Sequence, residues 1–381
     1  MDRRTGTSPD RFPGLDGLRG IAILLVMWGH FAPTLTPGET AWSRWTANLL
    51  NAGWAGVDLF FVLSGFLITD LLLRAKAGRP GVDPPSAGRY FGCFFARRAL
   101  RIAPLYLAVL AGVTIWLLGV GGRDTWRAWA ELSPWLWTCT SNVAVAREGW
   151  AFKFDGVLLN HFWSLAIEEQ FYLVWPALVY ACRRRTLAHA CVAALLLAPA
   201  LRAYYVFEAG NGYAAFALTP CRADAFAVGG LLALAVGAGT RRLAAAGAAM
   251  MSVGGAVALA AFADQRWIDV VGRSALPVFF GGAVLVGLKT RVGLWLDNPP
   301  LRFFGRYSYG LYVLHFLLYH PLDTLFPTSL GVPLRVAGCV LASSALAWCS
   351  WHLLEKRFLK LKAAFPMSAP ERPAGAIPVT S

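Results

Sequence analysis

Three ionisable residues lie in the first apolar stretch of the sequence, LDGLRGIAILLVMWGHF. Arg19 and His30 are eleven positions apart, which on an α-helix is three turns plus about 20°. Both therefore lie on one helix face, about 16 Å apart along the axis, and Asp16 can pair with Arg19 on that face. This arrangement predicts a polar path through a membrane protein. The alternative is that the arginine and the histidine only reach toward the two membrane interfaces.

A pair of carboxylates lies inside a second apolar stretch, HFWSLAIEEQFYLVWP. Glu168 and Glu169 are about two turns into this segment, and adjacent helical residues point about 100° apart. One of the two is therefore expected to face a polar interior. Carboxylates at membrane depth are costly, so the pair predicts a functional site.

Two arginines three positions apart, Arg98 and Arg101, precede a third apolar segment in RRALRIAPLYL. Both can reach one anionic ligand, and a planar guanidinium can donate two hydrogen bonds to a phosphate. Ordinary anchoring of a helix at the basic side of a membrane is the alternative.

Seven polar residues in other apolar motifs are weaker candidates for substrate binding, and each can equally be structural: Asp58, Ser64, His161, Arg222, Asp224, Ser308 and His315. The histidines are too scattered to predict a metal site, and we expect no metal cofactor. Neither a phosphate-binding loop nor a dinucleotide fingerprint is present.

The elements that must position these residues are strongly apolar. Of 381 residues, 57% are hydrophobic and 15% charged, which is typical of a protein that crosses a membrane several times. The sequence predicts an all-α, polytopic transmembrane bundle of about ten helices, since ten segments approach the roughly 20 residues that a span needs. They are about Leu15–Ala32, Gly56–Leu73, Ile102–Gly119, His161–Ala181, Leu187–Phe207, Pro220–Gly237, Leu243–Ala263, Ile268–Leu288, Phe303–Leu322 and Pro333–Leu354.

Basic clusters after alternate segments predict the orientation. They place both termini in the cytoplasm under the positive-inside rule. The net charge of +14 is thereby explained without nucleic acid, which we do not expect as a partner. The first segment lacks a small-x-small cleavage site and is interpreted as a retained helix. Residues 1–362 are expected to form one membrane domain, and residues 363–381 a disordered cytoplasmic tail.

A tryptophan-rich stretch between about Gly121 and Asn160 is predicted to lie outside the membrane. Its five tryptophans are interpreted as anchors at the lipid interface. Stacking on a sugar or another ring-shaped acceptor is the alternative.

Taken together, the motifs resemble the integral-membrane acyltransferase family three, which includes O-antigen acetylases, nodulation-factor acetylases and macrolide acylases. The resemblance runs from about Phe12 to Phe358. It rests on six motifs in the family's order: LDGLRGIAILLVMWGH, FFVLSGFLI, RRALRIAPLY, FWSLAIEEQFYLVWP, CRADAFAVGGLLA and YSYGLYVLH.

The resemblance implies that an acyl group, acetyl or another short chain, passes from cytoplasmic acyl-CoA to a hydroxyl, often on a sugar. His30 matches the family's catalytic residue and Arg19 completes its motif. Arg98 and Arg101 match its Arg-x-x-Arg pair and are expected to hold the phosphates of acyl-CoA, and Glu168 or Glu169 matches its membrane carboxylate. A carboxylate such as Glu168 is expected to orient the imidazole.

The family implies residence in a bacterial-type cytoplasmic membrane. Some members carry an extra external esterase-like domain that this sequence lacks, so a stand-alone transferase is expected. This expectation weakens the case for a cell-surface glycan as the acceptor, and a glycosylated metabolite such as a macrolide is the alternative. A transporter or flippase, in which the same buried charges line a translocation path, is the rival hypothesis.

Overall fold

A computed structural model describes residues 12, 14–36, 38–78, 84–237 and 242–367. The last part of the predicted tail, residues 368–381, lies outside this range. The helices and strands are, in chain order, α1 (Leu15–Phe31), α2 (Ala41–Leu50), η1 (Ala52–Trp54), α3 (Ala55–Ala77), α4 (Ala87–Val120), α5 (Arg123–Trp137), α6 (Ser141–Glu148), β1 (Lys153–Phe154), β2 (Val157–Leu158), α7 (Phe162–Ala181), α8 (Arg184–Ala203), η2 (Tyr204–Glu208), α9 (Gly212–Ala217), η3 (Thr219–Arg222), α10 (Ala223–Gly237), α11 (Leu243–Ala261), α12 (Gln265–Trp267), η4 (Ile268–Gly272), α13 (Arg273–Lys289), α14 (Val292–Leu296), α15 (Pro299–Leu314), α16 (Tyr319–Leu325), η5 (Thr328–Leu330), α17 (Val332–Ser350), η6 (Trp351–Glu355), α18 (Lys356–Lys360) and η7 (Leu361–Ala364).

Local sequence explains where several of these helices begin and end. α1 stops at Phe31 because the next residue, Ala32, precedes a proline and is extended, with a ψ of 143°. α15 begins with two prolines after Asn298, whose side chain accepts a hydrogen bond from the backbone N–H of Leu301 at 3.0 Å. Proline suits the first turn of a helix and asparagine its N-cap.

The all-α prediction is confirmed, and each of the ten predicted segments is largely helical. Seven helical stretches of the described chain are long and apolar enough to cross a membrane: 52–77, 87–120, 184–208, 219–237, 243–261, 265–289 and 332–364. The count of ten spans and the placement of the termini stay predictions. One predicted segment is wrong as a single helix: α15 ends at Leu314, and a turn separates it from α16.

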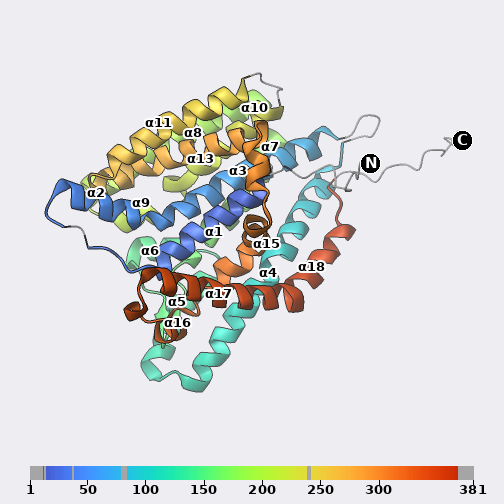
Figure 1. The fold of residues 1–381 in the computed structure, drawn as a ribbon. Coiled ribbons are helices and arrows are strands. Elements are labelled where there is room, and N and C mark those ends of the chain that lie inside the picture. Colours follow the sequence, from blue (N-terminus) through green and yellow to red (C-terminus); the bar gives the residue numbers. More distant parts are fainter. Residues whose placement is uncertain (1–11, 13, 37, 79–83, 238–241, 368–381) are drawn as a thin grey trace, which may run out of the picture.

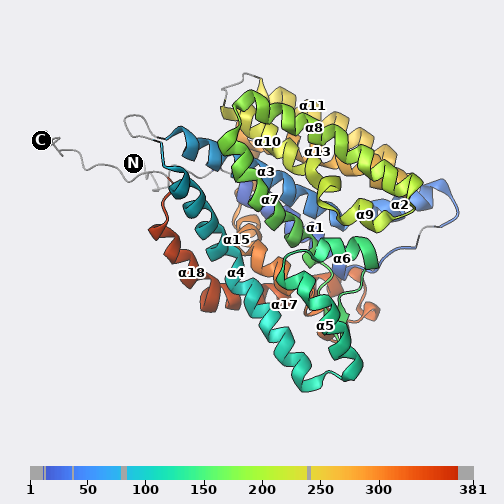
Figure 2. The same ribbon diagram turned by 180° about the vertical axis from the view of Figure 1, so that it is seen from behind.

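The helices pack around α1 and α3, which lie in the middle of the molecule (Figure 1). On one side α10, α13, α8 and α11 form a stack, and on the other lie α15, α17 and α4 (Figure 1). Seen from behind, α7 lies along α3, while the far end of α4 and α5 project from the body as a hairpin (Figure 2).

Small residues allow the central helices to approach one another closely. Gly65 of α3 faces the backbone carbonyl of Phe226 in α10, and Gly305 of α15 faces that of Asp16 in α1. A Cβ at either glycine would overlap the facing oxygen. Glycine at such crossings is typical of membrane helix pairs, where close backbone packing replaces the hydrophobic effect.

A short hairpin in the predicted outer loop is the one feature outside the all-α scheme among the described residues. β1 and β2 pair antiparallel, with Lys153 opposite Leu158. The turn residues Asp155 and Gly156 both have positive φ, 32° and 82°. An Asp-Gly pair favours this kind of tight turn, so the signal was present in the sequence although the hairpin was not predicted.

Candidate active site

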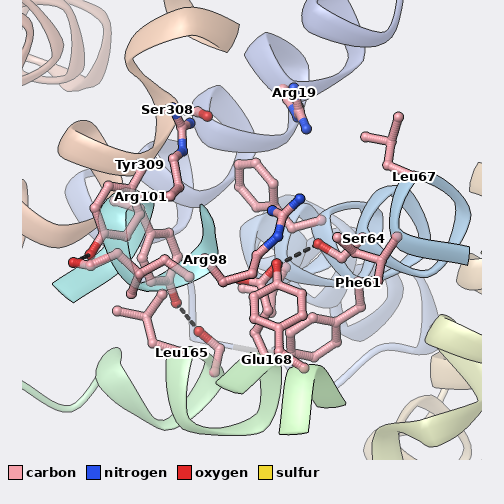
Figure 3. Close-up of a pocket in the computed structure, with 17 residues that line it drawn as sticks. Arg19, Phe61, Ser64, Leu67, Arg98, Arg101, Leu165, Glu168, Ser308 and Tyr309 are labelled. Carbon is pink, nitrogen blue, oxygen red and sulfur yellow. Dashed lines mark hydrogen bonds between the residues drawn. The ribbon is translucent and has the colours of Figure 1, made fainter. Parts of the chain in front are cut away.

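A cavity of about 130 Å³ opens inside the bundle between α1, α3, α4, α7 and α15. Its charged lining comes from Arg19, Arg98, Arg101 and Glu168, which are also the sequence candidates. The guanidinium groups of Arg19, Arg98 and Arg101 reach into the same space from α1 and α4 (Figure 3). The cavity therefore brings together the two arginine motifs, which are about 80 positions apart in the sequence.

A second and larger cavity, of about 580 Å³, adjoins the first because Arg19 and Arg101 line both. We call it the vestibule. Four arginines and one carboxylate lie around it, together with aromatic side chains: Arg19, Arg101, Arg302, Arg306, Asp16, Phe303, Tyr307 and Trp351. The predicted pairing of Asp16 with Arg19 is present, at 3.2 Å. The excess of positive charge suits an anionic ligand with several phosphates.

Two aromatic residues of the vestibule, Tyr307 and Trp351, make cation–π contacts with its arginines. The guanidinium of Arg306 lies 5.8 Å from the ring centre of Tyr307 and 5.3 Å from that of Trp351. Arg101 lies 6.0 Å from the ring centre of Trp351. Such contacts hold guanidinium groups in place while leaving N–H donors for a ligand.

The two adjacent glutamates face different cavities. Glu168 lines the central cavity, and its Oε1 accepts hydrogen bonds from the Ser64 hydroxyl and the Tyr172 phenol (Figure 3). Glu169 lines a separate groove beside α4 and α7, together with Gln170 and Cys139. There, burial raises the pKa of the Cys139 thiol, and the Glu169 carboxylate raises it further. Glu168 thus shares its cavity with Arg19, Arg98 and Arg101, whereas Glu169 shares its groove with Arg98 alone among these arginines.

His30 lies in a cluster of imidazoles at the other end of α1. Its Nδ1 is 2.7 Å from Nε2 of His315, the residue that follows α15. The ring of His161, just before α7, lies 5.3 Å from that of His315. Phe316 stacks on His30 at 4.4 Å. The expectation that Glu168 orients His30 is wrong in this structure, because Glu168 bonds to Ser64 instead and His315 contacts the imidazole.

Tyr312 separates the imidazole cluster from the central cavity. It lines the cavity, and its ring centre lies 5.6 Å from that of His161 and 5.9 Å from that of His315. Its hydroxyl donates a hydrogen bond to the backbone carbonyl of His161 at 3.0 Å and bonds to Ser164. His30 itself is partly exposed and is not part of the cavity lining. Ser308, by contrast, lies in the lining.

The remaining candidates form a buried ionic cluster outside the cavity lining. Asp58 pairs with Arg222 across α3 and η3. Asp224 accepts a bond from Arg202 at 2.8 Å and another from the hydroxyl of Ser274 at 2.7 Å. These residues link α3, α8, α10 and α13 through paired charges, which is what charges at membrane depth require.

Arg202 and Arg273 belong to this cluster and were not among the sequence candidates. Arg273 lies between two aromatic rings, 4.1 Å from the centre of Trp54 and 4.3 Å from that of Phe216, and pairs with Asp269 at 3.0 Å. The sequence could have identified both arginines, because they fall within predicted membrane spans, where an unpaired charge is costly. Tyr172 and Tyr312 had no such signal, because tyrosine is common in apolar helices.

Comparison with known proteins places these features in a family. The family model described as "Acyltransferase domain" matches residues 12–352 of the chain. The protein named "Putative peptidoglycan O-acetyltransferase YrhL", from Bacillus subtilis (strain 168), is 27% identical over 374 residues, which cover 90% of this chain and 54% of the relative.

Two further relatives match a shorter part of the chain. "O-acetyltransferase OatA" of Staphylococcus aureus (strain NCTC 8325 / PS 47) is 33% identical over 179 residues, 45% of this chain and 25% of the relative. "Peptidoglycan O-acetyltransferase OatA" of Listeria monocytogenes is 32% identical over 185 residues, 46% of this chain and 25% of the relative. The chain thus spans about half or less of the length of these relatives. No solved structure matches it.

Proposed function

The chain belongs to the acyltransferase domain family, and on that premise we propose that it is a membrane O-acyltransferase. It moves a short acyl group, such as acetyl, from acyl-CoA to a hydroxyl of a glycan. One observation carries this proposal beyond the family match: the vestibule and the central cavity adjoin each other and share Arg19 and Arg101. A ligand with a charged head and a narrow arm fits this shape.

The vestibule is proposed to hold the nucleotide part of acyl-CoA. Coenzyme A carries three phosphates and an adenine ring, and the vestibule offers four arginines and the rings of Tyr307 and Trp351. Arginine binds phosphate through paired hydrogen bonds, and aromatic rings stack on nucleobases. The pantetheine arm then lies in the central cavity beside Arg98 and Glu168, with the thioester toward Tyr312.

His30 is proposed to act as the general base. The acceptor oxygen attacks the thioester carbonyl carbon, so that a C–O bond forms and the C–S bond breaks. Neutral His30 takes the hydroxyl proton and then gives it to the CoA thiolate, which avoids a free alkoxide. Because Tyr312 lies between the cavity and His30, its side chain must rotate before the thioester reaches the imidazole. In the alternative mechanism, the acyl group passes first to His30 and then to the acceptor, and it requires the same rotation of Tyr312.

The acceptor is proposed to approach from the end of α1 that carries His30. The donor enters at the opposite end, where the basic clusters predict the cytoplasm. Two of the relatives are named as peptidoglycan O-acetyltransferases, one of them as putative, which favours a cell-wall glycan over a glycosylated metabolite such as a macrolide as the acceptor.

Purified protein in proteoliposomes, supplied with labelled acetyl-CoA and glycan fragments, tests the proposal. We expect label in an O-acetyl product identified by mass spectrometry. Replacing both Arg302 and Arg306 by Ala should raise KM for acetyl-CoA by about 5–30-fold, which corresponds to 1–2 kcal/mol of lost binding, with little change in kcat. Arg185→Ala, at an exposed arginine outside both cavities, is the matched control. Solute movement without any acetyl-CoA dependence would instead support a transporter.

A further inference from the structure

The contact between His30 and His315 determines which nitrogen of His30 is available as a base. We infer that His315 is a positioning residue that fixes the tautomer of His30, so that Nε2 of His30 is the atom that takes the acceptor's proton. This inference rests on the proposed function and goes beyond it. It follows from counting the protons on the two rings.

The proton on His315 is located by its surroundings. Its Nδ1 lies 2.9 Å from the backbone carbonyl oxygens of both Leu311 and Tyr312. Carbonyl oxygens only accept hydrogen bonds, so Nδ1 must carry a proton and donate it. These carbonyls lie in the last turn of α15, and that of Leu311 also accepts the backbone N–H of His315 at 2.9 Å. A neutral His315 then has a lone pair on Nε2.

The proton on His30 follows from that of its neighbour. Only one hydrogen can lie between Nδ1 of His30 and Nε2 of His315, which are 2.7 Å apart. Since Nε2 of His315 is the acceptor, Nδ1 of His30 is the donor, and Nε2 of a neutral His30 is bare. That atom has no hydrogen-bond partner among the described residues, and His30 as a residue is partly exposed.

A doubly protonated His315 would reverse the assignment, but the surroundings disfavour it. His315 is completely buried among the rings of Phe31, Tyr312 and Phe316 and two imidazoles. Its hydrogen bonds in the described chain go to carbonyl oxygens and to His30, and none goes to a carboxylate. A buried cation without a counter-ion is costly. The nearby His161 can add no compensating charge.

The hydrogen bond between His30 and His315 also stabilises protonated His30 after proton transfer. Once Nε2 of His30 has taken the proton, the imidazolium still donates from Nδ1 to His315, and a hydrogen bond from a charged donor is stronger than one from a neutral donor. A structural His315 would stabilise α15 equally well without this effect, so the two roles can be separated by experiment.

Two amide variants form a matched pair for the test. The terminal amide group of asparagine lies where Nδ1 of histidine would lie. The longer side chain of glutamine places its amide group where Nε2 would lie. His315→Asn therefore keeps the donor to the α15 carbonyls but offers His30 no acceptor, whereas His315→Gln offers a carbonyl oxygen to Nδ1 of His30. We expect kcat for acyl transfer to fall by about 10–100-fold in the Asn variant and to be largely retained by Gln, with KM for acyl-CoA changed less than about two-fold in both.

Comparable insertion and monodisperse elution of both variants exclude misfolding as the cause. An Asn variant equal to the Gln variant in kcat, at whatever level, overturns the role of His315. His30→Ala in the same assay keeps the two hypotheses apart. Near-wild-type turnover by His30→Ala refutes the proposed base itself, whereas an inactive His30→Ala together with equal Asn and Gln variants refutes only the positioning by His315.

Discussion

The ion pair between Asp58 and Arg222 is expected to stabilise the fold rather than bind substrate. Both side chains are buried, at 0% exposure for Asp58 and 2% for Arg222. Removing one partner of a buried pair leaves an uncompensated charge and typically costs about 3–5 kcal/mol. Because Nε and Nη1 of Arg222 already lack hydrogen-bond partners in the described chain, only aromatic rings at 5.8–5.9 Å would remain near the guanidinium. Asp58→Asn should therefore lower the free energy of unfolding by about 3–5 kcal/mol.

A double variant separates the cost of leaving one charge unpaired from the cost of replacing the side chains themselves. Asp58→Asn combined with Arg222→Gln removes both charges, so most of the loss should be recovered, since neutral replacements of a buried pair are often close to neutral in stability. The exposed pair Arg147–Glu148, with 66% and 58% exposed side chains and a separation of 3.9 Å, is the control. Arg147→Gln should cost less than about 1 kcal/mol.

The assay is unfolding in mixed micelles followed by tryptophan fluorescence, with acyl-transfer activity measured on the same samples at a temperature where all remain folded. Folded Asp58→Asn should keep KM for both substrates. A double variant as unstable as the sum of the single variants would refute the pairing argument. Normal stability with a raised KM for the acceptor would restore Asp58 as a substrate-binding residue.

Three further outcomes are expected. Glu168→Gln should lower kcat by about 10-fold or more because a charged acceptor of two hydrogen bonds is lost, whereas Glu169→Gln should leave it near wild type in the same transfer assay. Gly305→Ala should lower the unfolding free energy by about 1–3 kcal/mol through overpacking against α1; Gly88→Ala, where an added Cβ meets nothing within 4 Å, should not. In a variant that keeps Cys139 as its single cysteine, alkylation by an impermeant maleimide should be slow at pH 7 and still rise above pH 9, because a raised thiol pKa leaves little thiolate at neutral pH. A rate that levels off below pH 9 would contradict that shift.

The sequence by itself determined the class of fold and much of the cavity's charge. Apolar segments of about 20 residues indicate helices in lipid, because a helix satisfies all backbone hydrogen bonds within the segment. The pair Asp16–Arg19 follows from helical spacing alone, and so does the common reach of Arg98 and Arg101. These features depend on residues close together in the chain, whose relative positions a helix fixes.

The tertiary structure decided which of these residues meet. His30 and His315 are 285 positions apart, and helical periodicity contains nothing about their contact. The same holds for the assignment of Glu168 rather than Glu169 to the arginine cavity, which depends on how α7 is rotated against α3 and α4. Such rotations are set by the packing of whole helix faces, with glycines at the crossings. Local spacing therefore predicts which side chains share a helix face. Only the packed bundle determines which side chains of other helices they contact.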